Sequence, residues 1–221
     1  MSISNEYWKN RWEKGETEGF TQQEPNQFLV KYFSSFNLNP ESVCFVPLCG
    51  ASIDMTYLLE RGMKVIGVEL SEVAAQSFFT KHEISYVIGK TKDGHRVFES
   101  EKVSIVIADI LKVTPKTFGV TFDFWYDRGG YIALPTEVRK QYALKMAELC
   151  QGKTKVLLIT TTHNGPSDSA PYSISMEEMQ QHFSSALNLE ILEAFEREEM
   201  PKKHLKNGRT QQTFNIFQVN N

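Results

Sequence analysis

The stretch VCFVPLCGASIDMTYLLERGMKVIGVE, residues 43–69, decides the fold, because an apolar strand, a one-glycine turn, a helix-length segment and a strand ending in an acid follow in order. This order is the βαβ unit of nucleotide-binding folds, with Glu69 nineteen positions after Gly50. Gly50 lets the backbone approach a ligand, and the Glu69 carboxylate can accept two hydrogen bonds from a ribose diol. The turn lacks G-x-G-x-x-G, so little flexible backbone remains to hold a pyrophosphate. The pattern favours an adenosyl ligand without phosphates.

The rest of the chain alternates short apolar runs with segments of helical spacing, which is typical of an α/β fold. Nearly continuous apolar runs predict five buried parallel strands, at 43–46, 65–68, 103–107, 122–126 and 156–159. Helices are predicted at 53–60, at 71–82 with Ser71 as N-cap, and after Pro135 as the first helical residue. These helices would cover the faces of a Rossmann-like sheet.

Two antiparallel hairpins are also expected, one inserted before the third strand and one at an edge of the sheet. Residues 85–98 carry a KTKDGH turn between apolar flanks and predict a small hairpin. Residues 187–194 and 213–219 predict a C-terminal antiparallel hairpin whose strands are joined by a charged loop. An S-x-x-E capping box predicts a helix at 175–183 before that hairpin.

The N-terminal part of the chain predicts two short helices, at 5–14 and 26–36. No repeat, low-complexity tract or linker interrupts the 221 residues. We therefore expect one domain over residues 1–221, with 1–36 as a helical lid segment.

Composition and charge limit the classes of partner. The chain is 41% apolar and 23% charged with a formal net charge of −3, which gives no general attraction to nucleic acid and favours small-molecule partners. No run approaches the eighteen apolar residues of a membrane span, and the N-terminus lacks the apolar core of a signal peptide, so no membrane association is expected. The odd number of cysteines favours reduced thiols and a cytoplasmic protein. We expect a monomer.

The sequence lacks the motifs of several classes of enzyme. The histidines are scattered without the close spacing of a zinc site, and Cys44 with Cys49 is not C-x-x-C, so no metal is expected. The chain has neither a G-x-x-x-x-G-K-[ST] phosphate loop nor a G-x-S-x-G nucleophile turn. P-loop and serine-hydrolase chemistries are therefore excluded.

Two acids at predicted strand ends are candidate ligand-binding residues, and each has a structural alternative. Glu69 can accept from a ribose diol, or it can cap the helix that Ser71 begins. Asp109 can accept from an adenine amino group while Ile110 packs on the ring, or it can be a turn aspartate. The residues alone leave both alternatives open.

The best place for substrate chemistry is the sequence Asp127-Arg128-Gly129-Gly130, which follows the fourth predicted strand. A charged pair and two conformationally free residues there can contact a substrate. The alternative is an ion pair that braces a tight turn.

An aromatic cluster is predicted in the N-terminal segment. Trp8 and Trp12 lie four residues apart beside Arg11, and Phe20 follows Gly19. These rings can form a lid over a cationic or flat heteroaromatic ligand, although such a pair is more often part of a core.

The only basic cluster is KKHLKNGR at residues 202–209. Glu193, Glu196, Glu198 and Glu199 lie just upstream and can neutralise it. We therefore interpret it as a solvated hairpin tip.

Four separated motifs give the chain a specific resemblance. They are YWKNRW with Gly19-Phe20, VPLCG-x-S-x-DM at 46–55, GVELSE at 67–72 and YDRGGYIALP at 126–135. In this order and over nearly the whole length, the chain resembles the thiopurine S-methyltransferase family. The resemblance implies S-adenosylmethionine as methyl donor and a seven-stranded, mostly parallel methyltransferase sheet.

The resemblance also implies roles for residues that match the family motifs. Trp12, Leu48, Glu69 and Arg128 would contact the donor, Trp8, Asp109 and Ile110 would lie nearby, and Phe20 would lie between donor and acceptor. Ala51, Thr21 and the SAPY segment at 169–172 depart from the family pattern on the acceptor side. The resemblance therefore supports the donor-binding residues more directly than it supports a preference for thiopurine acceptors.

The expected activity is methyl transfer from S-adenosylmethionine to a thiol acceptor, such as a thiopurine or another aromatic or heterocyclic thiol. Acidic thiols are ionised near neutral pH, so no strong general base is required, and Asp127 and His163 are only secondary candidates. Related acceptors (other thiols, selenium or tellurium compounds, halides), a nicotinamide-dependent oxidoreductase and a non-catalytic adenosyl-ligand sensor stay open as alternatives.

Overall fold

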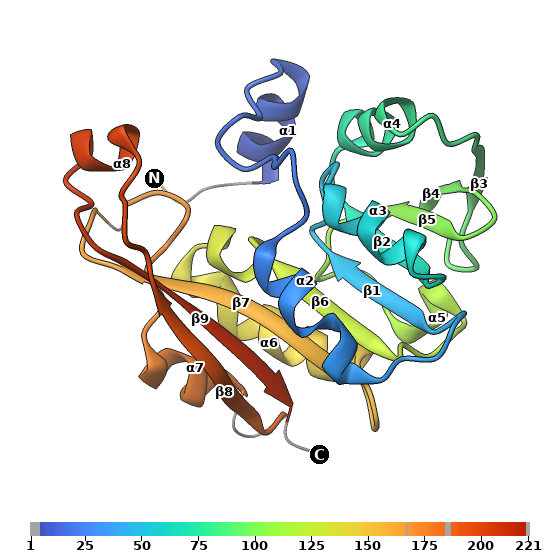
Figure 1. Cartoon of the computed structure of the whole chain (residues 1–221). Helices are drawn as coiled ribbons and strands as arrows, with labels where there is room; N and C mark the ends of the chain where they lie inside the picture. The colour runs from blue at the N-terminus through green and yellow to red at the C-terminus, as the bar shows by residue number, and fades with distance from the viewer. Residues whose placement is uncertain (1–4, 167, 184–186, 220–221) are drawn as a thin grey trace. The chain divides into compact units, whose positions relative to one another are not determined.

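The computed structural model describes residues 5–166, 168–183 and 187–219 (Figure 1). The described chain divides into two compact units. The first, called here the N-terminal unit, comprises residues 5–126 and 148–155, and the second, the C-terminal unit, comprises 127–147 and 156–219 with the gaps just given. Each unit is described separately, and the single domain expected from the sequence stays a prediction.

The N-terminal unit is built on a mostly parallel sheet with the strand order β3-β4-β5-β2-β1-β6. Its strands are β1 (Val43–Pro47), β2 (Lys64–Glu69), β3 (Val87–Lys90), β4 (Arg96–Glu99), β5 (Val103–Ile107) and the first residues of β6 (Phe124–Arg128). β1 pairs in parallel with β2 and β6, and β2 with β5, whereas β4 is antiparallel to both β5 and β3. The β2–β5 register aligns Glu69 with Ile107, so the ends of these strands lie at one edge.

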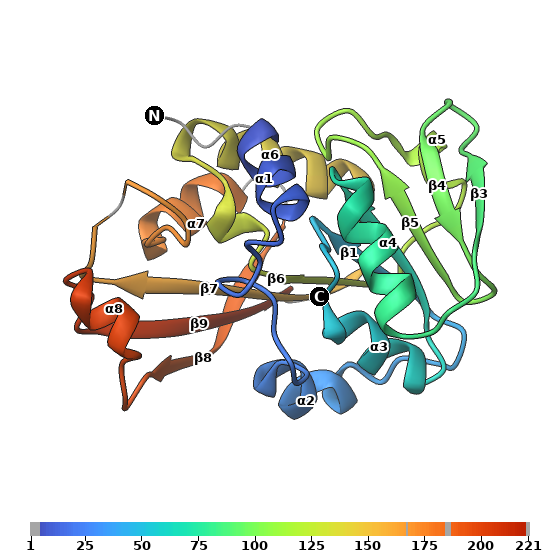
Figure 2. The ribbon, with the colours of Figure 1, turned by 90° about the horizontal axis from the view of Figure 1, so that it is seen from above.

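The helices of this unit are α1 (Asn5–Glu13), α2 (Gln27–Tyr32), the 3₁₀ helix η1 (Phe33–Phe36), α3 (Ile53–Glu60), α4 (Glu72–Lys81) and α5 (Pro115–Phe118). Serine N-caps start α3 and α4, because the Ser52 and Ser71 hydroxyls accept the N–H groups of Asp54 and Ala74. α1 lies beside α4 in both views (Figures 1 and 2). Apolar side chains from strands and helices form the core; Phe45, Leu58, Phe78 and Ile105 are fully buried.

The C-terminal unit contains the end of β6, the 3₁₀ helix η2 (Tyr131–Ala133), most of α6 (Thr136–Leu149), β7 (Lys155–His163), α7 (Met176–Phe183), β8 (Leu189–Glu196), α8 (Lys202–Lys206) and β9 (Gln212–Val219). β9 is antiparallel to β7 on one side and to β8 on the other (Figure 1). The predicted C-terminal hairpin is therefore confirmed, with an irregular register between Ile191 and Glu193.

The structure corrects three expectations. The described residues form nine strands rather than seven, because the hairpin β3–β4 pairs with β5 and extends the sheet. The loop between the last two strands contains the short helix α8. Asp127 and Arg128 are the last residues of β6 rather than the residues after it. None of the helices in the described ranges is long and apolar enough to cross a membrane.

Candidate functional site

The turn after β1 has a locked backbone. Leu48 and Gly50 both adopt left-handed conformations, with φ of 50° and 53°, which is unusual for leucine. The Cys49 side chain fills the space beside Gly67, where an added Cβ would lie 2.6 Å from Sγ. The Cys49 N–H donates to the Val68 carbonyl at 3.1 Å, so the turn is fixed to the end of β2.

Glu69 joins this turn to the start of α4. One carboxylate oxygen accepts the Gly50 N–H at 2.8 Å, and the other accepts the N–H groups of Leu70 and Ser71 at 2.7 and 2.8 Å. Burial raises the pKa of Glu69, although these three hydrogen bonds oppose the shift. A carboxylate has about four lone-pair positions, so an acceptor position remains for a ligand. Glu69 thus braces the chain before α4, whose N-cap is Ser71, and this structural role leaves room for the ligand-binding one.

Trp12 contacts the glycine of this turn. An added Cβ on Gly50 would lie 3.1 Å from Cζ2 of the Trp12 indole. Phe20 packs edge-on against both Trp12 and Trp8, with ring centroids 5.5 and 5.3 Å apart. Trp12 is buried, whereas Trp8 and Phe20 are partly exposed. Trp12 is therefore part of the core, whereas the Trp8 and Phe20 rings are accessible to a ligand.

Asp109 lies just beyond β5 and makes a local turn. One carboxylate oxygen accepts the Leu111 N–H at 3.0 Å, which is the turn-aspartate geometry, and the other accepts the Asn5 side-chain amide at 3.0 Å. Ala108 donates to the Glu69 carbonyl at 2.9 Å, so the ends of β2 and β5 are tied together. Ile110 is buried beside them.

Asp54, in the VPLCG-x-S-x-DM motif, has a bracing role that was not predicted from the sequence. Its carboxylate accepts the Asn26 N–H at 2.7 Å and the Tyr126 hydroxyl at 2.8 Å, and the residue is fully buried. Asn26 is the N-cap of α2, so Asp54 fixes the point where the N-terminal segment leaves the turn. Its partners are distant in sequence, so no pattern along the chain indicates this role.

In the C-terminal unit, Asp127 braces a tight turn. Its carboxylate accepts the Tyr142 hydroxyl at 2.6 Å and the Gly130 N–H at 2.9 Å, and it is bonded more weakly by the Tyr131 N–H. An added Cβ on Gly130 would lie 2.8 Å from this carboxylate, so only glycine fits. Burial raises the pKa of Asp127 to about 6, despite these hydrogen bonds. Asp127 thus braces the turn through hydrogen bonds to Tyr142 and the turn N–H groups; Arg128 is partly exposed.

A second buried network follows this turn and was missed from the sequence. Arg139 forms a bidentate pair with Glu178, at 2.5 and 3.0 Å, and the Tyr131 hydroxyl donates to the same carboxylate at 3.1 Å. The Arg139 guanidinium also lies over the Tyr172 ring, 5.4 Å from its centroid. Tyr172 donates its N–H to the Ile132 carbonyl at 2.8 Å. The network therefore connects the turn after β6 with the SAPY segment.

The residues at the strand ends of the N-terminal unit fit an adenosyl group. Glu69 ends β2, Asp109 lies two residues beyond the end of β5, Ile110 is buried, and Glu69 keeps an acceptor position. Within the described residues, no group of three or more histidine, cysteine, aspartate or glutamate side chains could hold a metal ion.

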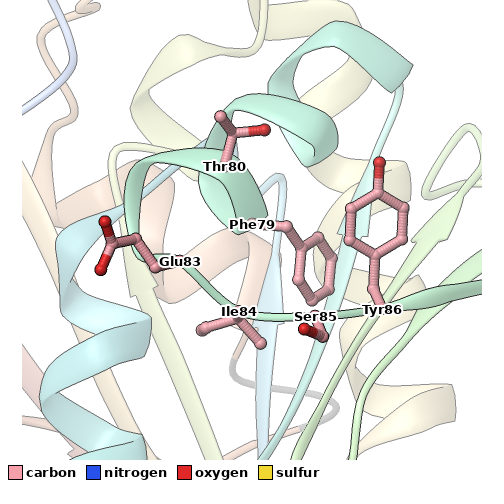
Figure 3. A pocket seen from close by; sticks show the side chains of 6 residues that line it. All are labelled: Phe79, Thr80, Glu83, Ile84, Ser85 and Tyr86. Atoms are coloured by element: carbon pink, nitrogen blue, oxygen red, sulfur yellow. The ribbon is translucent and has the colours of Figure 1, made fainter.

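An open hollow elsewhere in this unit is separate from these residues. It is lined by Phe79, Thr80, Glu83, Ile84, Ser85 and Tyr86, and Figure 3 shows the Phe79 and Tyr86 rings side by side. It lies at the last turn of α4, whereas Glu69 precedes the first turn. Ligands in open α/β sheets bind at the carboxyl ends of the strands, so this hollow is not the candidate site.

Comparisons with known proteins agree with this geometry. A model of the family described as thiopurine S-methyltransferase matches residues 3–219. A Francisella tularensis protein named thiopurine S-methyltransferase is 40% identical over 216 residues, which cover 97% of this chain and 94% of the relative. A protein of the same name from Psychrobacter cryohalolentis is 35% identical over 197 residues, 86% of this chain and 89% of its own.

Two solved structures share the fold at low identity. The 1,6-didemethyltoxoflavin-N1-methyltransferase of Burkholderia thailandensis, with bound S-adenosylhomocysteine, aligns with a TM-score of 0.66 at 12% identity over 98% of this chain and 87% of that one. A TehB-like SAM-dependent methyltransferase from Corynebacterium glutamicum aligns with a TM-score of 0.56 at 13% identity over 98% of both chains. The α/β methyltransferase fold expected from the sequence is confirmed.

Proposed function

Because the chain belongs to the thiopurine S-methyltransferase family, we propose that it transfers the methyl group of S-adenosylmethionine to a thiol acceptor, giving S-adenosylhomocysteine and a methyl thioether. The observation that carries the proposal is the family match over nearly the whole chain, together with acids at the ends of β2 and β5. The acceptor class proposed is thiopurines or other aromatic and heterocyclic thiols.

The proposed donor site consists mainly of residues from the N-terminal unit. Glu69 would accept from the ribose diol with its remaining acceptor position, and Leu48 would contact the donor from the strained turn. Further donor-contacting residues proposed from the family motifs are Trp12 and Arg128, with Trp8, Asp109 and Ile110 nearby. Asp109 accepts one hydrogen bond at each carboxylate oxygen, so it would have lone-pair positions left for the adenine amino group.

When bound, S-adenosylmethionine supplies an electrophilic methyl group on a sulfonium. Attack by a thiolate joins opposite charges and gives two neutral groups at the reacting atoms, so charge decreases on the way to the transition state. The protein's part is then to orient the thiolate and exclude water, for which Phe20 and Trp8 are the proposed surface. Asp127 is a catalytic candidate, but the reaction does not need it, because an acidic thiol is ionised without a general base. Its oxygens also already accept hydrogen bonds from Tyr142 and from the turn.

A methyl-transfer assay with labelled donor tests the proposal directly. Thiol, selenol and halide acceptors are compared in one panel, and we expect the aromatic thiols to be methylated. Labelling of halide alone, or of no acceptor, would reject the thiol assignment. In parallel, S-adenosylhomocysteine at a hundredfold over its Kd should stabilise the protein by roughly 2.7 kcal/mol, whereas NADH should not.

Arg128→Lys tests the proposed donor contact. Lysine keeps the charge but cannot form the bidentate, planar contact of a guanidinium with the donor carboxylate, so we expect lower turnover and a higher KM for the donor with the fold intact. Arg96→Lys is the matched control, because Arg96 is an exposed residue paired with Glu72. Equal kinetics in the two variants would remove Arg128 from the site.

The proposal also includes a monomeric, cytoplasmic enzyme that needs neither a metal, a nucleic acid nor a membrane. We expect a chelator to leave turnover unchanged and size-exclusion chromatography to give a mass near 25 kDa. Loss of activity that Zn²⁺ or Mg²⁺ restores would contradict the metal-free mechanism.

A further inference from the structure

The chain contains two asparagine–glycine pairs, Asn164-Gly165 and Asn207-Gly208, and both lie in the C-terminal unit. In such a pair the backbone nitrogen of the glycine can attack the amide carbon of the asparagine side chain, because glycine has no Cβ to hinder the approach. The attack forms a five-membered succinimide ring. In a folded protein it requires that the asparagine side chain and the following nitrogen can move. The two pairs differ in this respect.

The Asn164 side chain is held by three hydrogen bonds. Its amide nitrogen donates to the Thr210 hydroxyl at 2.7 Å, and its carbonyl oxygen accepts the N–H groups of Thr210 and Gln211, both at 3.0 Å. The space beside the next residue is also filled, because an added Cβ on Gly165 would lie 2.8 Å from the Arg209 Cβ. A succinimide at Asn164 would therefore require these hydrogen bonds to break in a crowded place.

Asn207 is exposed at the end of α8, where it is the C-cap, and its side chain has no hydrogen-bond partner among the described residues. An added Cβ on Gly208 would meet no atom within 4 Å, so the ring has room to form. The Gly208 N–H donates to the Leu205 carbonyl at 3.0 Å, and this bond must open before the attack. α8 has five residues and none of them is buried, so opening its last turn costs little.

The charges around Asn207 favour the same reaction. The Asn207 N–H donates to the His204 carbonyl at 3.0 Å. Burial lowers the pKa of His204, and the charged groups that lower it further are all basic: Arg209, Arg197, Lys203 and His163. The neutralisation by upstream glutamates expected from the sequence is therefore not found at this residue. Positive surroundings stabilise the deprotonated nitrogen that attacks and the carboxylate that the reaction finally produces.

We propose that Asn207 is a site of spontaneous deamidation, whereas the fold protects Asn164. The Gly208 nitrogen forms a bond to Cγ of Asn207, the bond from Cγ to the side-chain nitrogen breaks, and ammonia leaves with the proton of the Gly208 N–H. Water then opens the succinimide at either carbonyl and gives aspartate or isoaspartate. Each product places a new carboxylate at the end of α8 and makes the net charge of the chain more negative by one unit. This modification is independent of the proposed methyltransferase function.

Incubation of the purified protein at neutral pH and about 37 °C tests the proposal. Digestion after glutamate separates the two sites, because Glu177 and Glu199 lie between them, and mass spectrometry then measures a gain of about one dalton at each asparagine. We expect Asn207 to react roughly 10- to 100-fold faster than Asn164, because the protected site must first give up its hydrogen bonds. Equal rates in the folded protein, or faster reaction at Asn164, would overturn the proposal.

Two controls separate the effect of the fold from that of the sequence. In concentrated urea both pairs lose their surroundings, so their rates should become similar; a difference that persists in urea would mean that the fold does not protect Asn164. Thr210→Val removes the hydroxyl that accepts from the Asn164 amide and should speed deamidation of Asn164 several-fold while leaving the rate at Asn207 unchanged. Unchanged rates at both sites in the folded variant would contradict protection by these hydrogen bonds.

Discussion

Glu69 combines a structural and a proposed ligand-binding role in one carboxylate. Both oxygens are bonded to backbone N–H groups, and the proposed ribose contact uses what acceptor capacity is left. Glu69→Gln removes the charge and one acceptor oxygen, so we expect the Kd for S-adenosylhomocysteine to rise about 10- to 100-fold, as for loss of a charged hydrogen bond. Titration calorimetry measures this. Glu72→Gln, at an exposed neighbouring carboxylate, should leave the Kd unchanged; equal values for both variants would mean that Glu69 only braces the chain between β1 and α4.

Asp127 should make stability depend on pH. Its folded pKa of about 6 lies above the ordinary aspartate pKa of 3.8, so folding favours the protonated form. The contribution of Asp127 to stability is therefore fully present below about pH 4 and is lost as the pH rises to 6 and beyond. Two pKa units correspond to roughly 3 kcal/mol.

Asp127→Asn tests this sign. Asparagine does not titrate but keeps one oxygen for the Gly130 and Tyr131 N–H groups. Urea unfolding at pH 4.5 and pH 7 should show that the variant gains stability relative to the unaltered protein as the pH rises. The raised pKa of Glu69 acts with the same sign in both proteins and cancels in this difference. If the variant and the unaltered protein differ in the free energy of unfolding by the same amount at both pH values, ionisation of Asp127 does not destabilise the fold.

The role of a side chain could be predicted from the sequence where its hydrogen-bond partner lies within a few residues. The Ser71 cap and the bond from Ser71 N–H to Glu69 join side chains to N–H groups only two or three residues away. Asp54 bonds residues 28 and 72 positions away, and Arg139 meets Glu178 39 positions away. No pattern along the chain encodes such contacts, so the Asp54 brace and the Arg139 network could not be predicted.

At the scale of elements, the turn after β1 is fitted to β2 through one close contact. Gly67→Ala would place a Cβ 2.6 Å from the Cys49 sulfur and should destabilise the protein by about 1–3 kcal/mol. Cys49→Ala removes that sulfur, so the double variant should be more stable than the two single effects predict by about 0.5–3 kcal/mol. Urea unfolding of all four proteins gives this coupling. Gly67→Ala combined with Cys44→Ala should be additive, and additivity in the Cys49 pair as well would disprove the contact.

Apolar periodicity predicts the elements that bury a face and fails for those that do not. The helix at 53–60 and the strand at 103–107 have the predicted bounds, because both place apolar side chains in the core. α8 has no buried residue and mostly basic side chains, so no pattern marks it as a helix. Phe122 lies two residues before β6, but its ring is buried because it stacks on the Phe45 ring, with the centroids 4.3 Å apart. A buried ring outside the strand therefore shifted the predicted strand toward its N-terminus.

At the scale of the whole molecule, the two compact units are joined without linkers. Three regular elements cross their boundaries: β6 between residues 126 and 127, α6 between 147 and 148, and β7 between 155 and 156. A strand or helix transmits local order along its length, because its hydrogen bonds form cooperatively. The single domain predicted from the sequence stays a prediction.

The distribution of tryptophan allows that prediction to be tested. Trp8, Trp12 and Trp125 all belong to the N-terminal unit, so tryptophan fluorescence reports that unit, whereas far-UV circular dichroism reports helices and strands of both. For one cooperative domain we expect the two urea transitions to coincide. Saturating S-adenosylhomocysteine should then shift both by the same amount, because a ligand stabilises the whole cooperative unit to which it binds. A fluorescence transition that moves alone would show two independently folding domains, with the proposed donor site in the first.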